Sequence, residues 1–147
     1  MHKPAFTLIE LIMSIVIIGV LSAVAIPKFM GLSDNAKISS ELSTAASVQV
    51  ALDACHGEWI INEGNFTCGA SIASSSLNEN GYPDSLGSPL DAILKQAPTG
   101  WKLNGSNYTG PASDSAKGAS KCKADKPCKS KHWEYDSTDG TFTLKAN

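Results

Sequence analysis

The sequence predicts an α+β fold in which a long N-terminal helix, transmembrane in its first half, packs against a small antiparallel sheet. Three patterns predict it: an uncharged apolar run near the N-terminus, an apolar stripe at helical spacing after that run, and two alternating segments around a turn near the C-terminus. The chain has 147 residues, which is enough for one compact domain of ordinary size, or for a smaller domain with a long extension.

The apolar run has no charged residue from Leu11 to Pro27. Counted from Phe6 to Pro27 it has 22 residues, which as a helix would rise about 33 Å, close to the thickness of a bilayer core. Residues 6–27 are therefore expected to span a membrane. A secretory signal peptide cut after Ala23–Ala25 is the alternative. Against it, the basic leader covers only residues 1–5, and Glu10 lies just inside the apolar run.

Residues 28–56 are expected to form an amphipathic second half of the same helix. One long helix is predicted from about Thr7 to Ala54, loosened near Gly19, Pro27 and the stretch Gly31–Asn35. The residues of the apolar stripe recur at spacings of three or four: Ile38, Leu42, Ala45, Val48, Leu52 and Cys55.

Three charged residues, Lys37, Glu41 and Asp53, are expected to lie off this stripe. The pair His56-Gly57 is a helix stop signal, with His56 complementing the helix dipole.

Residues 57–147 are expected to form a small β-containing domain that is rich in loops up to about residue 116. Trp101-Lys102-Leu103 is a candidate strand opening. The clearest β signal is a hairpin around the turn Ser137–Gly140, with four side chains expected on one face against the amphipathic helix: Trp133, Tyr135, Phe142 and Leu144.

The segment Ala5-Phe6-Thr7-Leu8-Ile9-Glu10-Leu11, followed by the apolar run, resembles the N-terminal signature of type IV prepilins, which type II secretion pseudopilins share. The resemblance covers about residues 3–32. It implies that a prepilin peptidase/methyltransferase cuts between Ala5 and Phe6 and methylates the new amine of Phe6. The family usually has Gly before the cut, so Ala5 departs from the pattern.

The same resemblance makes Glu10 the fifth residue of the mature chain. A carboxylate in hydrocarbon costs a few kcal/mol, whereas the new amine of Phe6 is positive at neutral pH. If that amine belongs to a neighbouring subunit, the pair would fix the axial register between helices during assembly. The alternative is that Glu10 only reaches the cytoplasmic interface from its place near the helix start.

The four cysteines form two sequence-local pairs, Cys55 with Cys68 and Cys122 with Cys128. An even count in a membrane-inserted chain with a small outer domain favours disulfides formed in an oxidising compartment. The sequence alone permits three pairings. A metal site at Cys122, Cys128 and His132 is the alternative, but the cysteine spacing is long for structural zinc and the surrounding lysines would repel a cation.

Six lysines lie between residues 117 and 131, against the single acid Asp125, and the chain has no arginine. A solvated charged loop is the ordinary interpretation of such a run. The sharper hypothesis is contact with DNA or another polyanion through phosphate attraction rather than base recognition. Five residues are the candidates for that contact: Lys121, Lys123, Lys126, Lys129 and Lys131.

No catalytic constellation, cofactor motif or metal-binding motif is visible in the sequence, and an enzyme is not expected. Asp136, Asp139 and the Thr138 hydroxyl are candidate calcium ligands, but their turn has too few oxygen ligands, and an ordinary Asp-Gly turn explains them. The resemblance therefore implies a structural subunit of a type IV pilus-like filament, polymerised through its hydrophobic N-terminal helix. A pseudopilin of a type II secretion system, or a minor pilin that binds polyanions through residues 117–131, is the alternative.

The resemblance also sets the expected surroundings of the chain. Its partners would be copies of itself in a helical filament, related pilins and the processing enzyme. It would cross the inner membrane once, with the globular domain in the periplasm, and then enter an extracellular or periplasmic filament.

Overall fold

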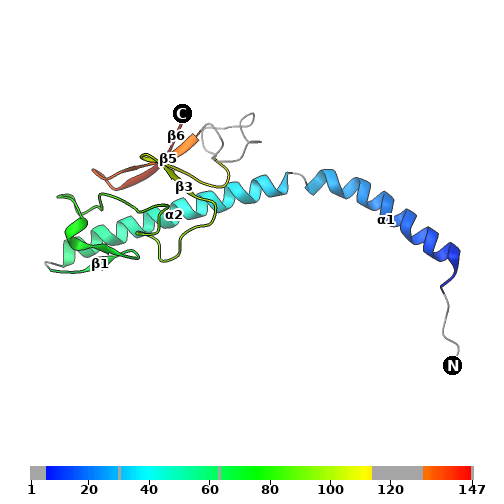
Figure 1. Ribbon diagram of the computed structural model, residues 1–147, viewed down its shortest axis with the longest axis horizontal. Helices are drawn as coiled ribbons and strands as arrows, with labels where there is room; N and C mark the ends of the chain where they lie inside the picture. Colours follow the sequence, from blue (N-terminus) through cyan, green and yellow to red (C-terminus); the bar gives the residue numbers. More distant parts are fainter. Residues whose placement is uncertain (1–5, 30, 63, 114–130, 147) are drawn as a thin grey trace, which may run out of the picture. The chain divides into compact units, whose positions relative to one another are not determined.

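The computed structural model describes residues 6–29, 31–62, 64–113 and 131–146. Residue contacts divide the chain into two units, Met1–Ala36 and Lys37–Asn147. The first contains helix α1 (Leu8–Phe29), and the second contains most of helix α2 (Leu32–Ile61) together with all the strands. This α+β composition confirms the predicted fold class (Figure 1).

Helix α1 is unbroken over its 22 residues, including Gly19 and Pro27, although loosening was predicted at both. The interruption falls between Phe29 and Leu32, where Gly31 is a turn residue. Pro27 lies in the last turn of α1. A helical proline lacks the N–H that would bond the carbonyl four residues before it, so its effect falls on the preceding turn and does not explain the break after Phe29.

Helix α2 continues to Ile61, seven residues past the predicted end at Ala54. The His56-Gly57 stop signal is therefore wrong. A helical glycine costs about 1 kcal/mol relative to alanine, and tertiary packing outweighs that cost here. The His56 ring stacks on Tyr82 at 4.6 Å between centroids and on Trp59 at 5.7 Å, which holds the last turns of α2 against the globular unit.

The buried face of α2 differs from the predicted stripe at Ile38, which is only partly buried, and at the neighbouring positions 41 and 42. Leu42 is 38% exposed, whereas Glu41 is completely buried. The buried positions are Glu41, Ala45, Val48, Leu52 and Cys55. Their alternating spacings of four and three still give one helical face. The prediction that Glu41 lies off the core face is wrong because its carboxylate has hydrogen-bond partners inside the domain.

The main sheet has four antiparallel strands in the order β3-β4-β5-β6: Lys102–Asn104, Asn107–Thr109, Lys131–Asp136 and Thr141–Ala146. Trp133 pairs with Leu144, and Tyr135 pairs with Phe142, so these four side chains share one face as predicted. The predicted strand opening at Trp101–Leu103 corresponds to β3. A small second sheet pairs β1 (Thr67–Cys68) with β2 (Ile72–Ala73), which precedes the short 3-10 helix η1 (Ser74–Ser76).

One hydrophobic core unites α2 with the main sheet and with the loops between residues 68 and 101. Trp133 and Phe142 stack at 5.4 Å between ring centroids. The ring of Trp101 packs against both in a tilted orientation. Gln49 of α2 accepts a hydrogen bond from Phe142 N at 3.1 Å and donates one to the Gly140 carbonyl. The hairpin therefore packs on the amphipathic helix, as predicted.

Candidate functional site

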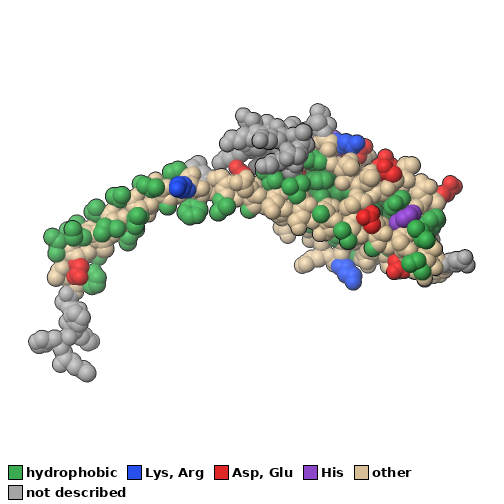
Figure 2. Space-filling model, turned by 180° about the vertical axis from the view of Figure 1, so that it is seen from behind, with side chains coloured by type: hydrophobic (Ala, Val, Ile, Leu, Met, Phe, Trp, Pro, Cys, Tyr) green, Lys and Arg blue, Asp and Glu red, His purple; other side chains and the backbone are tan. Residues whose placement is uncertain are grey.

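Helix α1 has an apolar or small residue at nearly every position, and none of its residues is buried. Hydrophobic side chains run along the side of it that Figure 2 shows. Glu10, in its first turn, and Lys28, in its last turn, are its charged residues. It lies in the helical stretch that is long and apolar enough, by length and composition, to cross a membrane. A helix that is hydrophobic on all sides is normally buried, either in protein or in lipid.

Glu10 takes part in a reciprocal cap at the start of α1. Thr7 precedes the first helical residue, and its Oγ1 accepts a hydrogen bond from Glu10 N at 3.4 Å. In return, Glu10 Oε2 accepts hydrogen bonds from Thr7 N at 3.4 Å and from Thr7 Oγ1 at 3.2 Å. This arrangement is a capping box, which satisfies two backbone donors that a helix start leaves without partners. Glu10 therefore also stabilises the start of α1, a local function that its position in the prepilin signature does not indicate.

The outer face of α2, opposite the core, is almost without charge. Its exposed residues are mainly small: Ser39, Ser43, Ala46, Ser47, Val50 and Ala54. Val50, at its centre, is 68% exposed. Asp53 borders this face, where its carboxylate accepts a hydrogen bond from Gln49. Within the described part of the globular unit, every exposed large apolar side chain belongs to α2: Leu42, Val50, Trp59, Ile60 and Ile61.

The buried carboxylate of Glu41 is the centre of a four-donor network. Its Oε2 accepts hydrogen bonds from Ala112 N at 2.7 Å and Ser113 N at 3.0 Å. Its Oε1 accepts hydrogen bonds from Trp133 Nε1 at 2.7 Å and from the Ser113 hydroxyl. Gly110 lies against the carboxylate, and an added Cβ would collide with it. The network joins α2 both to the chain before residue 114 and to strand β5.

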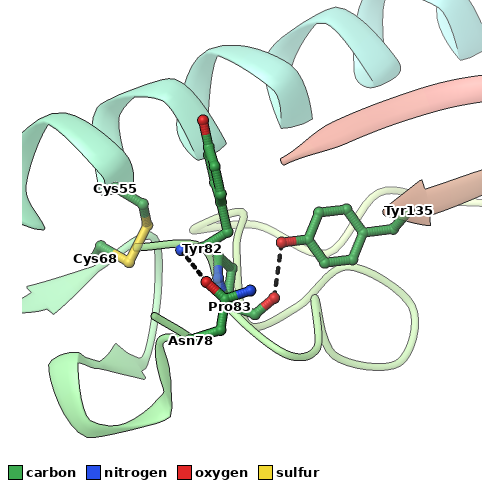
Figure 3. Close-up of a disulfide and its surroundings, with 6 residues drawn as sticks. All are labelled: Cys55, Cys68, Asn78, Tyr82, Pro83 and Tyr135. Atoms are coloured by element: carbon green, nitrogen blue, oxygen red, sulfur yellow. Dashed lines mark hydrogen bonds between the residues drawn. A yellow bond between two sulfur atoms is a disulfide. The ribbon is translucent and has the colours of Figure 1, made fainter. Parts of the chain in front are cut away.

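A disulfide joins Cys55 of α2 to Cys68 of β1, with the Cα atoms 5.2 Å apart (Figure 3). The following loop is fixed to the sheet, because Tyr135 OH donates a hydrogen bond to the Pro83 carbonyl at 2.7 Å. Burial of this ring raises the pKa of the Tyr135 hydroxyl. The first predicted disulfide thus attaches the first loop of the globular unit to the helix.

Several predicted site residues lie outside the described residues: Ala5, Lys121, Cys122, Lys123, Lys126, Cys128 and Lys129. The second disulfide and most of the polyanion contact therefore stay predictions. Phe6 is described and is 76% exposed. Lys131 opens β5 with its side chain buried.

Asp136 and Asp139, the candidate calcium ligands, accept hydrogen bonds from residues of their own turn and of the strand that follows it. Asp136 accepts a hydrogen bond from Thr138 N at 2.9 Å, and this bond lowers the pKa of the Asp136 carboxyl. Asp139 accepts hydrogen bonds from the backbone N–H of Thr141 at 3.1 Å and from its hydroxyl at 2.6 Å. Within the described residues, no group of three or more His, Cys, Asp or Glu side chains is placed to hold a metal ion.

Comparison with known proteins agrees with the N-terminal signature. A family model described as the prokaryotic N-terminal methylation motif matches residues 1–26. The type IV narrow pilus major component PilA5 of Thermus thermophilus is 38% identical over 85 residues, which cover 51% of this chain and 73% of that protein. The chain belongs to the type IV pilin family.

Two further relatives of this pilin are subunits of fimbriae. The type IV major fimbrial protein FimA of Dichelobacter nodosus is 29% identical over 92 residues, 54% of this chain and 59% of that protein. A fimbrial protein of Neisseria meningitidis serogroup B is 37% identical over 87 residues, 57% of this chain and 49% of that protein. No solved structure matches the chain.

Family and fold together make the chain a structural subunit of a type IV pilus-like filament. The pilus function is favoured over a secretion pseudopilus, because the relatives are pilus and fimbrial proteins rather than secretion components or enzymes. The apolar helix and the methylation motif indicate a membrane-anchored subunit that is processed as a prepilin and assembles with other pilins.

Proposed function

We propose that the mature pilin begins at Phe6, crosses the inner membrane once through α1, and polymerises when Glu10 pairs with the N-terminal amine of a neighbouring subunit. The observation that carries the proposal is the surface of α1, a helix of 22 residues with none of them buried and with one carboxylate in its first turn. Such a surface requires lipid before assembly and neighbouring helices after it.

The length of α1 fits both environments. At 1.5 Å per residue the helix rises about 33 Å, which matches the hydrocarbon core of a bilayer. In this proposal the globular unit lies in the periplasm while the subunit is anchored, and the prepilin peptidase/methyltransferase acts on the opposite side. The filament that follows is extracellular or periplasmic.

The capping box leaves Glu10 able to make the proposed pair. Its Oε2 is used by Thr7, whereas its Oε1 accepts no hydrogen bond from the described residues. The Thr7 amide remains an amide after a cut before Phe6, so the cap is compatible with the mature chain. A positive amine at Oε1 would offset the desolvation of the carboxylate, which an isolated charge in an apolar bundle cannot do.

The outer face of α2 extends the assembly surface beyond the membrane. An ordinary solvent-facing helix carries charged residues, whereas this face presents Ser, Ala and one central Val50. Small side chains allow helix backbones to approach closely, as they do in packed membrane helices. In the proposed filament, this face and α1 pack against the helices of neighbouring copies.

The test compares two variants that separate the charge of Glu10 from its cap. Glu10→Gln keeps an oxygen that can accept from Thr7 but loses the charge, so we expect normal membrane insertion and few or no filaments. Thr7→Val loses the cap, worth about 1 kcal/mol of helix stability, but keeps the carboxylate, so we expect filaments. The measurement is the yield of sheared filaments relative to membrane-inserted subunit, by immunoblot and electron microscopy.

Two outcomes would contradict the proposal. Normal filament yield from Glu10→Gln would show that the charge does not direct assembly. Loss of filaments from Thr7→Val, with Glu10→Gln unaffected, would assign Glu10 to the helix cap alone.

A further inference from the structure

The chain contains the dipeptide Asn-Gly twice, at Asn80-Gly81 and at Asn104-Gly105. In this dipeptide the asparagine side chain is open to attack by the next backbone nitrogen, because glycine places no side chain beside that nitrogen. The two pairs have the same local chemistry, so a difference in their reactivity has to come from the fold. The structure holds the two pairs in different ways.

Hydrogen bonds and packing restrain the first pair. Gly81 N donates to the Asn78 carbonyl at 2.9 Å, and Asn80 Nδ2 donates to the Thr138 carbonyl at 2.8 Å. Gly81 is buried, and a Cβ added there would collide with the ring of Trp59. The backbone nitrogen and the side-chain amide of this pair are therefore both held by bonds that have to open before they can react.

The second pair lies at the turn of the β3–β4 hairpin. Asn104 is the last residue of β3 and pairs with Asn107, so Gly105 and Ser106 form the turn between the strands. Asn104, Gly105 and Ser106 are exposed, and a Cβ added at Gly105 would meet no atom within 4 Å. Gly105 N and the Asn104 side chain make no hydrogen bond with any of the described residues. Both groups can therefore approach each other in solvent.

We propose that Asn104 is a site of spontaneous deamidation, and that the fold protects Asn80 from the same reaction. Gly105 N attacks the side-chain carbonyl carbon of Asn104, so that a new N–Cγ bond forms and the Cγ–Nδ2 bond breaks. The departing NH2 group takes the proton of the Gly105 amide and leaves as ammonia, which yields a succinimide. Water then opens the succinimide at one of its two carbonyls and gives aspartate or isoaspartate. The net reaction consumes one water and releases one ammonia.

The modification changes the tip of the hairpin but not the core. Either product adds a carboxylate, which is negative at neutral pH. Isoaspartate also lengthens the backbone by one methylene at position 104, which disturbs the pairing of this residue with Asn107. Because β3 is a three-residue strand at the edge of the sheet, strands β4, β5 and β6 keep their pairing. Conversion at Asn104 would thus accumulate with the age of a subunit without unfolding the globular unit.

The test uses the purified full chain in detergent, incubated at mildly alkaline pH and physiological temperature and sampled over time. Peptide mapping by tandem mass spectrometry gives the converted fraction at each asparagine. We expect Asn104 to convert about tenfold or more faster than Asn80, because two hydrogen bonds have to open before Asn80 can react. Asn107 is the matched control, since it lies in the same hairpin but is followed by tyrosine, and it should stay unconverted.

The same measurement in urea separates the effect of the fold from that of the sequence. In the unfolded chain the two Asn-Gly pairs should convert at similar rates. Asn104→Gln should abolish conversion at its own position, because the longer side chain would have to close a larger ring, and should leave the rate at Asn80 unchanged. Equal rates at the two pairs in the folded protein, or a faster rate at Asn80, would overturn the proposal. So would an Asn104 that stays intact in the folded protein over the time in which it converts in urea.

Discussion

Replacement of Glu41 by glutamine is the sharpest test of the globular unit. The substitution preserves shape but turns one of the two carboxylate oxygens into an NH2 group. Each oxygen accepts two hydrogen bonds, from Ala112 N and Ser113 N on one side and from Ser113 Oγ and Trp133 Nε1 on the other. An NH2 group in place of Oε2 would face two backbone N–H donors, whereas one in place of Oε1 would face Trp133 Nε1, with the Ser113 hydroxyl able to turn and accept.

The expected loss of stability follows from those contacts. A hydrogen bond to a charged group contributes about 1.5–3 kcal/mol, and each buried donor that is left without an acceptor costs about 1–3 kcal/mol. We therefore expect Glu41→Gln to lower the free energy of unfolding by about 3–5 kcal/mol, a large part of the total stability of an ordinary domain. Ser113→Ala removes one hydroxyl donor, so the Glu41 carboxylate keeps three of its four hydrogen bonds. This variant should lower the free energy of unfolding by about 1–2 kcal/mol.

The assay is urea unfolding of the detergent-solubilised full chain, followed by tryptophan fluorescence. Trp101 and Trp133 lie in the core, so their emission reports on this unit. With a denaturant slope of about 1.5 kcal/mol per molar urea, the loss corresponds to a midpoint lower by about 2–3 M. Asp34→Asn, an exposed carboxylate of the same helix, should change stability by less than about 0.5 kcal/mol. A change below about 1 kcal/mol in Glu41→Gln would refute the network as a source of stability.

Three further predictions concern processing, the disulfide and pH. Intact-mass measurement of membrane-extracted protein should give a chain that begins at Phe6 with one methyl group on its amine; a retained Met1 would contradict this. Cys68→Ser should lower the free energy of unfolding by about 3 kcal/mol in the chain-entropy model, because the bridge closes a loop between residues 13 apart in sequence. Under reducing conditions the variant and wild type should have the same free energy of unfolding, and a difference that persists there would contradict the disulfide as the cause. Burial raises the pKa of Tyr135 above its usual value of about 10, so its contribution to stability should be constant below about pH 10 and fall as pH rises further, when only the unfolded chain loses the proton. Urea unfolding between about pH 9 and higher pH should show a smaller fall in Tyr135→Phe, and an equal fall would refute the assignment.

The elements with a strong local pattern were predictable from the sequence. Helix α1 is specified by its apolar run, and the β5–β6 hairpin by alternation around an Asp-Gly turn. The first disulfide agreed with cysteine proximity in sequence. Strands β1, β2 and β4 have two or three residues each, which is too short for alternation to be recognised.

Three features depend on contacts between distant parts of the chain and were missed for that reason. Glu41 has the correct spacing for the core face, but its charge argued against burial until its donors from residues 112–133 were known. The end of α2 depends on Tyr82, which lies more than twenty residues farther along the chain. The surface hollow between η1 and the loop after Pro83 has lining residues from two separate segments that no local pattern connects.

The central claim is that the pilin polymerises through α1 with Glu10 paired to a neighbour. Electron cryomicroscopy of purified filaments at side-chain resolution tests it most directly. The account predicts α1 in the filament interior, with a Glu10 carboxylate oxygen about 3 Å from the N-terminal amine nitrogen of an adjacent subunit. A filament in which Glu10 faces solvent, or in which α1 makes no contact with neighbouring helices, would contradict it.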